Sequence, residues 1–168
     1  MEELKLIVNC NEKHYSHNAG IKKLYKYIAG KGSNKNKEAD IYIGAKGLSR
    51  KHDKAALQVI NIQNALNKAK GRRIYHIVVS FPKDIKDYDM VREAADSIAD
   101  FLFDDYQVYY AVHHSTDNLH IHFGVNAVSY LTGRKWHNSK KEFSQFKSSV
   151  LDKVNRVMEK NHYSPLKL

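Results

Sequence analysis

The chain has 168 residues, a length that suits a single domain with a core of ordinary size. Its 28 Lys and Arg residues exceed its 18 Asp and Glu residues, which gives a formal net charge of +10. A surplus of this size favours a polyanionic partner, because phosphate neutralisation releases counterions and supplies affinity for nucleic acid. An anionic membrane is the competing partner, but no segment has the pattern of a basic amphipathic helix.

The only cysteine, Cys10, excludes an internal disulfide and a cysteine-based zinc site. Any bound metal must therefore be held by histidine and carboxylate groups. No run of residues is apolar for long enough to cross a membrane, and the amino terminus lacks a signal-peptide pattern. These features predict a cytoplasmic protein without membrane insertion.

Residues 4–9 predict the first strand, and their apolar residues on both faces favour a central place in a sheet. A polar connection leads to a helix that begins at Ser16 or Asn18, runs to about Ala29 and stops at the glycines that follow. The buried stripe of this helix is expected to consist of Ile21, Leu24, Tyr25 and Ile28.

Two tyrosines of this helix differ in their predicted surroundings. Tyr25 lies on the apolar stripe, whereas Tyr27 lies off it, beside Lys23 and Lys26. Aromatic residues on helices are usually packing residues. A tyrosine that attacks a phosphate, however, must be exposed and surrounded by positive charge. Tyr27 is therefore the candidate nucleophile, and Tyr25 is the second choice.

Residues 30–38 form a basic, glycine-containing loop in which Lys31 and Lys35 could clamp a phosphate backbone, although such a run is more often a solvated loop. The next predicted helix begins at a cap on Asp53 and ends near Ala69. Its expected core-facing residues are Leu57, Val59, Ile60 and Leu66.

Residues 41–43 predict a short strand or an ordered loop, and residues 73–81 predict the clearest strand of the chain. His76 in this strand is a candidate for holding a metal ligand or a phosphate, although a lone histidine in a strand is more often an ordinary polar residue. Amphipathic helices are predicted at 88–104, on the back of the sheet, and at 140–161.

Residues 109–126 predict a β-hairpin that carries four histidines. Strand side chains alternate between the faces of a sheet, and the apolar residues of both strands define the buried face. The opposite face then carries His113, His120 and His122. His114 falls on the apolar side and is expected to have no metal role.

Three neutral imidazoles on one face of a rigid sheet can hold a divalent metal and leave coordination positions open, as a catalytic site requires. A histidine pair alone could equally be polar residues on the wet face of a sheet. The third histidine, at matching parity, favours a metal site. Asn126 shares this face and is a candidate for supporting the ligands.

Residues 127–130 are predicted to continue the strand into a turn, followed by Arg134, Lys135 and Trp136. A basic pair beside an indole suits a single-stranded partner, because aromatic stacking and phosphate neutralisation together hold such strands. The alternative is that Trp136 packs against the edge of the hairpin.

The pattern His113-x6-His120-x-His122, after an apolar strand, resembles the three-histidine motif of the HUH endonuclease superfamily. The order of the elements is most similar to conjugative relaxases of the MobA/VirD2 type, in which a tyrosine helix precedes the histidine hairpin. The sequence Lys26-Tyr27-Ile28 is similar to the Lys-Tyr-Ile motif of that family, which assigns the nucleophile to Tyr27.

The chain departs from the relaxase pattern at one position. Relaxases commonly carry an acidic residue two positions after the first histidine, and here that position is Ser115. Asp117, two residues further on, is then the candidate for supporting the metal ligands.

The resemblance implies one relaxase domain over residues 1–168, of the α+β class, with a largely antiparallel sheet and packed helices; the mixed order of predicted elements favours the same class. It also implies metal-dependent nicking of single-stranded or hairpin DNA at a transfer origin, with Mg²⁺ or Mn²⁺ and a 5′-phosphotyrosine intermediate. The implied setting is the bacterial cytoplasm, with accessory relaxosome proteins as further partners.

Other functions fit parts of the sequence. Rolling-circle initiators and single-tyrosine transposases of the same superfamily place the tyrosine after the histidine motif, whereas Tyr27 precedes it. A non-catalytic DNA-binding module would need the histidines but no nucleophile. A phosphoesterase that acts on small cyclic phosphates would not require the large positive charge.

Overall fold

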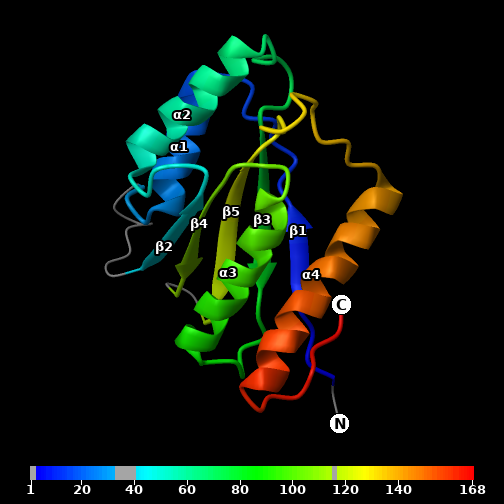
Figure 1. Cartoon of the computed structure of the whole chain (residues 1–168). Helices are drawn as coiled ribbons and strands as arrows, with labels where there is room; N and C mark the ends of the chain where they lie inside the picture. Colours follow the sequence, from blue (N-terminus) through cyan, green and yellow to red (C-terminus); the bar gives the residue numbers. More distant parts are fainter. Residues whose placement is uncertain (1–2, 33–40, 115–116) are drawn as a thin grey trace.

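A five-stranded antiparallel sheet organises the computed structural model, which describes residues 3–32, 41–114 and 117–168. The strands lie in the order β1-β3-β5-β4-β2 (Figure 1), and each neighbouring pair is antiparallel. The predicted α+β class with a largely antiparallel sheet is thereby confirmed. The strands are β1 (Ile7–Cys10), β2 (Tyr42–Lys46), β3 (Ile74–Ser80), β4 (Val108–His113) and β5 (His120–Asn126).

Helices cover both faces of this sheet. α3 and α4 pack over the apolar residues of the hairpin, as predicted for the first of them (Figure 1). α1 and α2 pack on the opposite face, where Ile74, Tyr109 and Ala111 form a second core with them. The alternation of apolar residues in the hairpin predicts only one buried face. The sheet is buried on both faces, because Ile74, Tyr109 and Ala111 lie on the same face as the histidines and pack against α1 and α2. The helices are α1 (Asn18–Ile28), α2 (His52–Ala65), α3 (Tyr88–Phe103) and α4 (Lys140–Lys160).

α1 lies close to β5. Its predicted apolar stripe is buried, and Tyr25 and Ile28 rest directly on Gly124. A Cβ atom at Gly124 would lie 2.6 Å from Cε1 of Tyr25, so a side chain there would push the helix away from the strand. The glycine thus sets the distance between α1 and the histidine hairpin.

The structure corrects two expectations about strands. β1 is an edge strand and not a central one, and Ile7 is 54% exposed on it. β5 ends at Asn126 and does not continue through residues 127–130, because the Asn126 side chain accepts a hydrogen bond from Val128 N and the chain turns there.

The predicted helix after the basic loop has a different face and different ends. α2 begins at His52, after the cap residue Lys51, and ends at Ala65. Leu57 and Leu66 are 47% and 42% exposed, so the expectation that they face the core is wrong. Small residues allow the helix to approach the sheet closely, and its buried face consists of Ala55, Ala56, Val59, Ile60 and Gln63.

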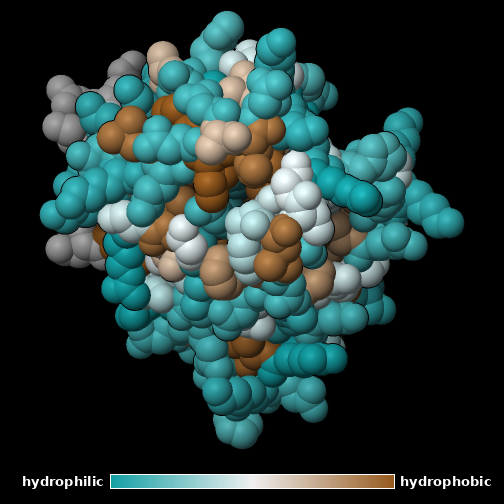
Figure 2. All heavy atoms as spheres, turned by 45° about the horizontal axis from the view of Figure 1, so that its top comes forward, coloured by the Kyte–Doolittle hydropathy of each residue, from teal (hydrophilic) through white to brown (hydrophobic). Residues whose placement is uncertain are grey.

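The two helices on the back of the sheet agree closely with the predicted ones. The Asp87 side chain caps α3 by accepting a hydrogen bond from Met90 N, and Ser139 and Glu142 form a capping box at the start of α4. Among the described residues, no helix is long and apolar enough to cross a membrane. Figure 2 shows one face of the molecule, on which hydrophilic side chains predominate and hydrophobic ones gather in recessed groups.

Candidate functional site

The antiparallel pairing of β4 and β5 brings the three predicted histidines together. His113 pairs with His120 across the ladder, and His122 lies opposite Ala111. The ring centroids of His113 and His122 are 4.4 Å apart, and those of His120 and His122 are 5.0 Å apart. Ligand atoms from the three side chains all lie within 4.8 Å of one another. The alternation of side chains along the two strands therefore predicted this cluster of three histidines, and the fold brings them together as expected.

Each histidine of the cluster has one ring nitrogen in a hydrogen bond. Nε2 of His113 donates to the carbonyl oxygen of Ile28 at 2.8 Å, and Nδ1 of His120 donates to that of Asn118 at 2.9 Å. Nδ1 of His122 is 2.8 Å from Nε2 of His76. Such bonds fix the tautomer and direction of a histidine that binds metal through its other nitrogen.

The donor set fits a divalent cation. Nε2 of His122 is buried and has no hydrogen-bond partner in the described part of the chain, which suits a nitrogen that coordinates a cation. Burial, helped by the neighbouring His113, lowers the pKa of His122 to about 2, and burial lowers that of His76 to about 4. These imidazoles are therefore neutral near pH 7, as metal ligands must be.

Tyr27 lies next to this cluster, on the last turn of α1. Its half-buried ring lies with its centroid 5.2 Å from that of His122 and 5.7 Å from that of His113. The helix reaches the histidines at this point because His113 also binds the carbonyl oxygen of Ile28, the next residue.

Tyr25 has a different environment. Its side chain is fully buried, its hydroxyl donates to the carbonyl oxygen of Gly124 at 3.0 Å, and its ring stacks on that of Tyr109 with centroids 5.1 Å apart. Burial raises the pKa of Tyr25 above its ordinary value. Tyr25 therefore fastens α1 to the sheet, while Tyr27 faces the histidines.

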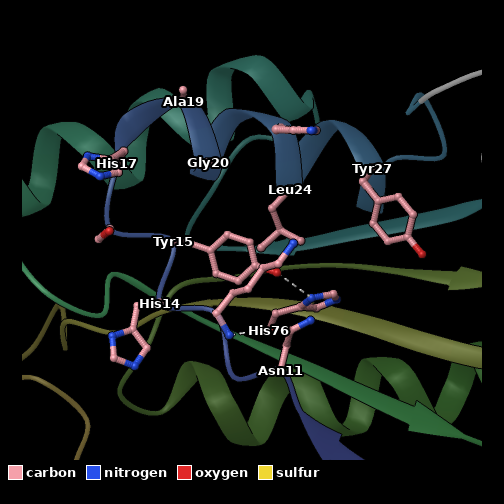
Figure 3. Close-up of a pocket in the computed structure, with 12 residues that line it drawn as sticks. Asn11, His14, Tyr15, His17, Ala19, Gly20, Leu24, Tyr27 and His76 are labelled. Carbon is pink, nitrogen blue, oxygen red and sulfur yellow. Dashed lines mark hydrogen bonds between the residues drawn. The ribbon is translucent and has the colours of Figure 1, made fainter.

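A pocket of about 750 Å³ extends from Tyr27 along the first turns of α1 (Figure 3). Its wall is made by this helix and by the loop between β1 and α1. The ring of Tyr15 lies in the middle of the pocket, and its hydroxyl is 3.1 Å from Nδ1 of His76. The polar and charged residues of the lining include Lys13, His14, His17, Lys23 and His76. The pocket is therefore an extension of the histidine site.

The predicted DNA-binding lysines of the first helix lie around this site. Lys23 lines the pocket, and Lys26 and Lys31 are exposed near the end of α1. Lys35 lies outside the described residues.

The predicted basic and aromatic segment after the hairpin lies at the other end of β5. Arg134 is exposed there, and Nζ of Lys135 donates to the carbonyl oxygen of Arg72 at 3.1 Å. Arg72 in turn binds the carbonyl oxygen of Lys13, a residue of the pocket lining. This segment therefore lies near the end of the pocket that is remote from Tyr27.

Trp136 is not beside the histidines. Its indole packs on Tyr75, with ring centroids 4.6 Å apart, and on Tyr106 and Phe146. Tyr75 points to the face of the sheet opposite His76. The interpretation of Trp136 as a packing residue at the edge of the hairpin agrees with this placement.

Two residues expected to support the ligands have no hydrogen bond to them among the described residues. Asn126 is buried at the far end of β5, where its side chain binds Gln63 at 2.7 Å and Gln107 at 3.0 Å. Asp117 is exposed, and no hydrogen bond links its carboxylate to the histidines in the described residues. His76 does contact a histidine of the cluster. Strand parity could not place Asn126, because it gives the face of a side chain and not its position along the strand.

Sequence reasoning missed Tyr15. It lies in a connection that the sequence marks only as polar, and no periodic pattern indicates its role. Its backbone is in the left-handed region with φ of 53°, a conformation that few non-glycine residues adopt.

The chain matches one protein-family model, described as "Relaxase: MobA/VirD2-like, nuclease domain", over residues 27–162. It is similar to two Escherichia coli proteins named TraI, with 37% identity over 73 residues and 36% over 76 residues. These matches cover 42% and 44% of the chain but only 10% of each TraI protein. The chain thus spans about a tenth of the length of these relatives.

Two solved structures share the fold. One is described as "Molecular Basis of Vancomycin Resistance Transfer in Staphylococcus aureus", with a TM-score of 0.70, 14% identity, and coverage of 98% of this chain and 97% of that one. The other is the MobM relaxase domain, bound to Mn and to pMV158 oriT DNA, with a TM-score of 0.64, 13% identity, and coverage of 98% and 90%. At this level of identity, the likeness concerns the fold.

Proposed function

Because the chain belongs to the MobA/VirD2-like relaxase family, whose nuclease domain matches residues 27–162, we propose that it nicks and rejoins single-stranded DNA at an origin of transfer. We take residues 1–168 as the relaxase domain. The placement of Tyr27 against His113 and His122, two members of the three-histidine cluster, is the single observation that carries this proposal, because it puts a candidate nucleophile beside a metal-type cluster.

In the proposed reaction, the hydroxyl oxygen of Tyr27 attacks the scissile phosphorus. A bond forms between this oxygen and phosphorus while the bond to the 3′ oxygen breaks. The tyrosine loses its proton, the leaving 3′ oxygen gains one, and the 5′ phosphate stays on the protein. Since the phosphodiester is exchanged and not hydrolysed, a free 3′ hydroxyl can reverse the reaction.

We propose that His113, His120 and His122 hold Mg²⁺ or Mn²⁺. When bound, such a cation polarises the non-bridging oxygens of the phosphate and offsets the charge that develops on them. The buried Nε2 of His122, which has no hydrogen-bond partner among the described residues, and the lowered pKa of this histidine support this assignment.

The pocket beside Tyr27 is the proposed path of the DNA strand. Lys13 and Lys23 supply positive charge along it, and Tyr15 offers an aromatic face. Single strands are held by this combination of phosphate neutralisation and base stacking. Arg134 and Lys135 extend the positive charge beyond the end of the pocket. The MobM domain, which has the same fold, was solved with oriT DNA.

We further propose a bacterial cytoplasmic setting and accessory relaxosome proteins as partners. Relaxase reactions occur on plasmid DNA, which lies in the cytoplasm. The match to two TraI proteins of Escherichia coli, over 10% of the length of each, supports the bacterial setting.

The proposal is tested with single-stranded oligonucleotides tiled across the DNA that flanks the gene, labelled at the 3′ end. With Mn²⁺, one oligonucleotide should give a labelled protein–DNA band on a denaturing gel, because the 3′ fragment carries the phosphotyrosine. A 5′ label should instead appear on a shortened free strand. EDTA should remove both products, and metal-dependent binding without any adduct would favour a non-catalytic module.

A further inference from the structure

Two hydrogen bonds run from the histidine cluster into the pocket. Nδ1 of His122 is 2.8 Å from Nε2 of His76, and Nδ1 of His76 is 3.1 Å from the hydroxyl of Tyr15 (Figure 3). His122 and His76 are only 5% and 6% exposed, so water cannot easily replace either histidine in the bond between them. The three side chains come from β5, β3 and the loop before α1.

The role of His122 determines which atom donates in each of these two hydrogen bonds. A metal bound through Nε2 requires that this nitrogen carry no proton, so a neutral His122 must carry its proton on Nδ1 and donate it to Nε2 of His76. His76 then carries its own proton on Nδ1 and donates it to the Tyr15 oxygen. The opposite direction would place a proton on Nε2 of His122 and block coordination.

Tyr15 is held in place at an energetic cost. Its φ of 53° lies in the left-handed region, which costs a non-glycine residue about 1–2 kcal/mol. Hydrogen bonds hold the two residues that precede Tyr15: Arg73 N donates to the carbonyl oxygen of His14 at 2.8 Å, and Arg72 donates to that of Lys13 at 3.1 Å. The loop that carries Tyr15 is thus held by the two arginines just before β3, and the Tyr15 hydroxyl lies beside His76 within β3.

We propose that Tyr15 and His76 are positioning residues that fix the tautomer of His122 for metal binding. Histidine ligands usually donate to a carboxylate, a backbone carbonyl or water. In the described residues, the converging group contains three histidines and no carboxylate, and a neutral imidazole backed by a phenol takes the acceptor role for His122. The inference rests on the proposed metal site and adds two residues to it.

Calorimetric titration with Mn²⁺ tests the proposal without DNA. His76→Leu leaves the Nδ1 proton of His122 without an acceptor, and should weaken Mn²⁺ binding by about tenfold to a hundredfold. His76→Gln offers an amide oxygen as acceptor and should stay within a few-fold of the wild type. Tyr15→Phe should weaken binding by less than His76→Leu, because water in the pocket can replace the hydroxyl.

Nitrogen NMR of the metal-free protein reports the tautomer directly. The wild type should show His122 protonated on Nδ1, and His76→Leu should shift it toward the Nε2 form. A proton on Nε2 of His122 in the wild type, or unchanged Mn²⁺ affinity in His76→Leu, would overturn the proposal. His120→Ala distinguishes failure of the metal site from failure of this further proposal. Unchanged Mn²⁺ binding in this variant would refute the metal site itself. Loss of binding would support the metal site, so that a negative result with His76→Leu would then refute only the roles of Tyr15 and His76.

Discussion

At the scale of single residues, the two tyrosines of α1 have separate tasks. Tyr27 faces His113 and His122, so replacing it with phenylalanine removes the oxygen that we propose as the nucleophile and leaves the packing of the ring nearly unchanged. We expect Tyr27→Phe to bind Mn²⁺ and single-stranded DNA normally and to form no covalent product. Denaturing gel electrophoresis with 3′-labelled DNA measures the product.

Tyr25→Phe is the matched control for this substitution. It removes the hydroxyl that binds the Gly124 carbonyl oxygen, which should cost about 1 kcal/mol of stability. The adduct should persist in this variant, and peptide mapping should locate it on Tyr27. A full-strength adduct in Tyr27→Phe would refute the assignment of the nucleophile.

Contacts between residues on two paired strands could be predicted from the sequence, whereas contacts made only by the tertiary fold could not. The pairing of adjacent strands converts sequence parity into position, so His113, His120 and His122 could be grouped before the fold was known. The contact of Tyr15 with His76 joins residues 61 positions apart through a loop without periodicity, and no sequence pattern encodes it.

At the scale of elements, the close packing of α1 on β5 positions Tyr27, the proposed nucleophile. A Cβ at Gly124 would lie 2.6 Å from Cε1 of Tyr25 and 3.0 Å from Cδ1 of Ile28. We expect Gly124→Ala to lower the free energy of unfolding by about 1–3 kcal/mol and to lift α1 from the sheet. Adduct formation should fall further than the folded fraction does, as measured by denaturant titration beside the gel assay.

Gly44→Ala provides the comparison, because it causes a similar clash away from α1. A Cβ at Gly44 would lie 2.2 Å from Cζ of Tyr110, on the face covered by α3. This variant should also be destabilised, yet its folded molecules should form the adduct at the wild-type rate. Equal losses of activity in the two variants would show that α1 does not control the position of Tyr27.

Element prediction succeeded where hydrophobic periodicity was strong. α3 and α4 carry large apolar residues at helical spacing, and their buried faces agree with the expected ones. The core-facing residues of α2 were predicted only in part: Val59 and Ile60 are buried as expected, but alanines complete the buried face while Leu57 and Leu66 are exposed. β1 was placed at the centre because hydrophobicity alone does not distinguish an edge strand such as this one.

At the scale of the whole molecule, the net charge of +10 should govern DNA affinity. For single strands, the logarithm of affinity falls against the logarithm of salt with a slope of about −0.7 per phosphate contact. With about four to six contacts, the slope should be about −3 to −4. Fluorescence anisotropy with a labelled oligonucleotide over a series of salt concentrations measures it, and a flat dependence would favour a small-substrate phosphoesterase.

A pair of charge variants tests whether DNA follows the pocket or is attracted only by the overall charge of the molecule. Lys23 lines the pocket beside Tyr27, whereas Lys160 lies on α4, on the other face of the sheet, and pairs with Glu93. Lys23→Gln and Lys160→Gln remove the same charge from the molecule. If the strand runs through the pocket, Lys23→Gln should reduce the steepness of the salt dependence by about 0.7, and Lys160→Gln should leave it unchanged. Equal slopes in the two variants would mean that DNA is attracted by the overall charge and does not follow the pocket.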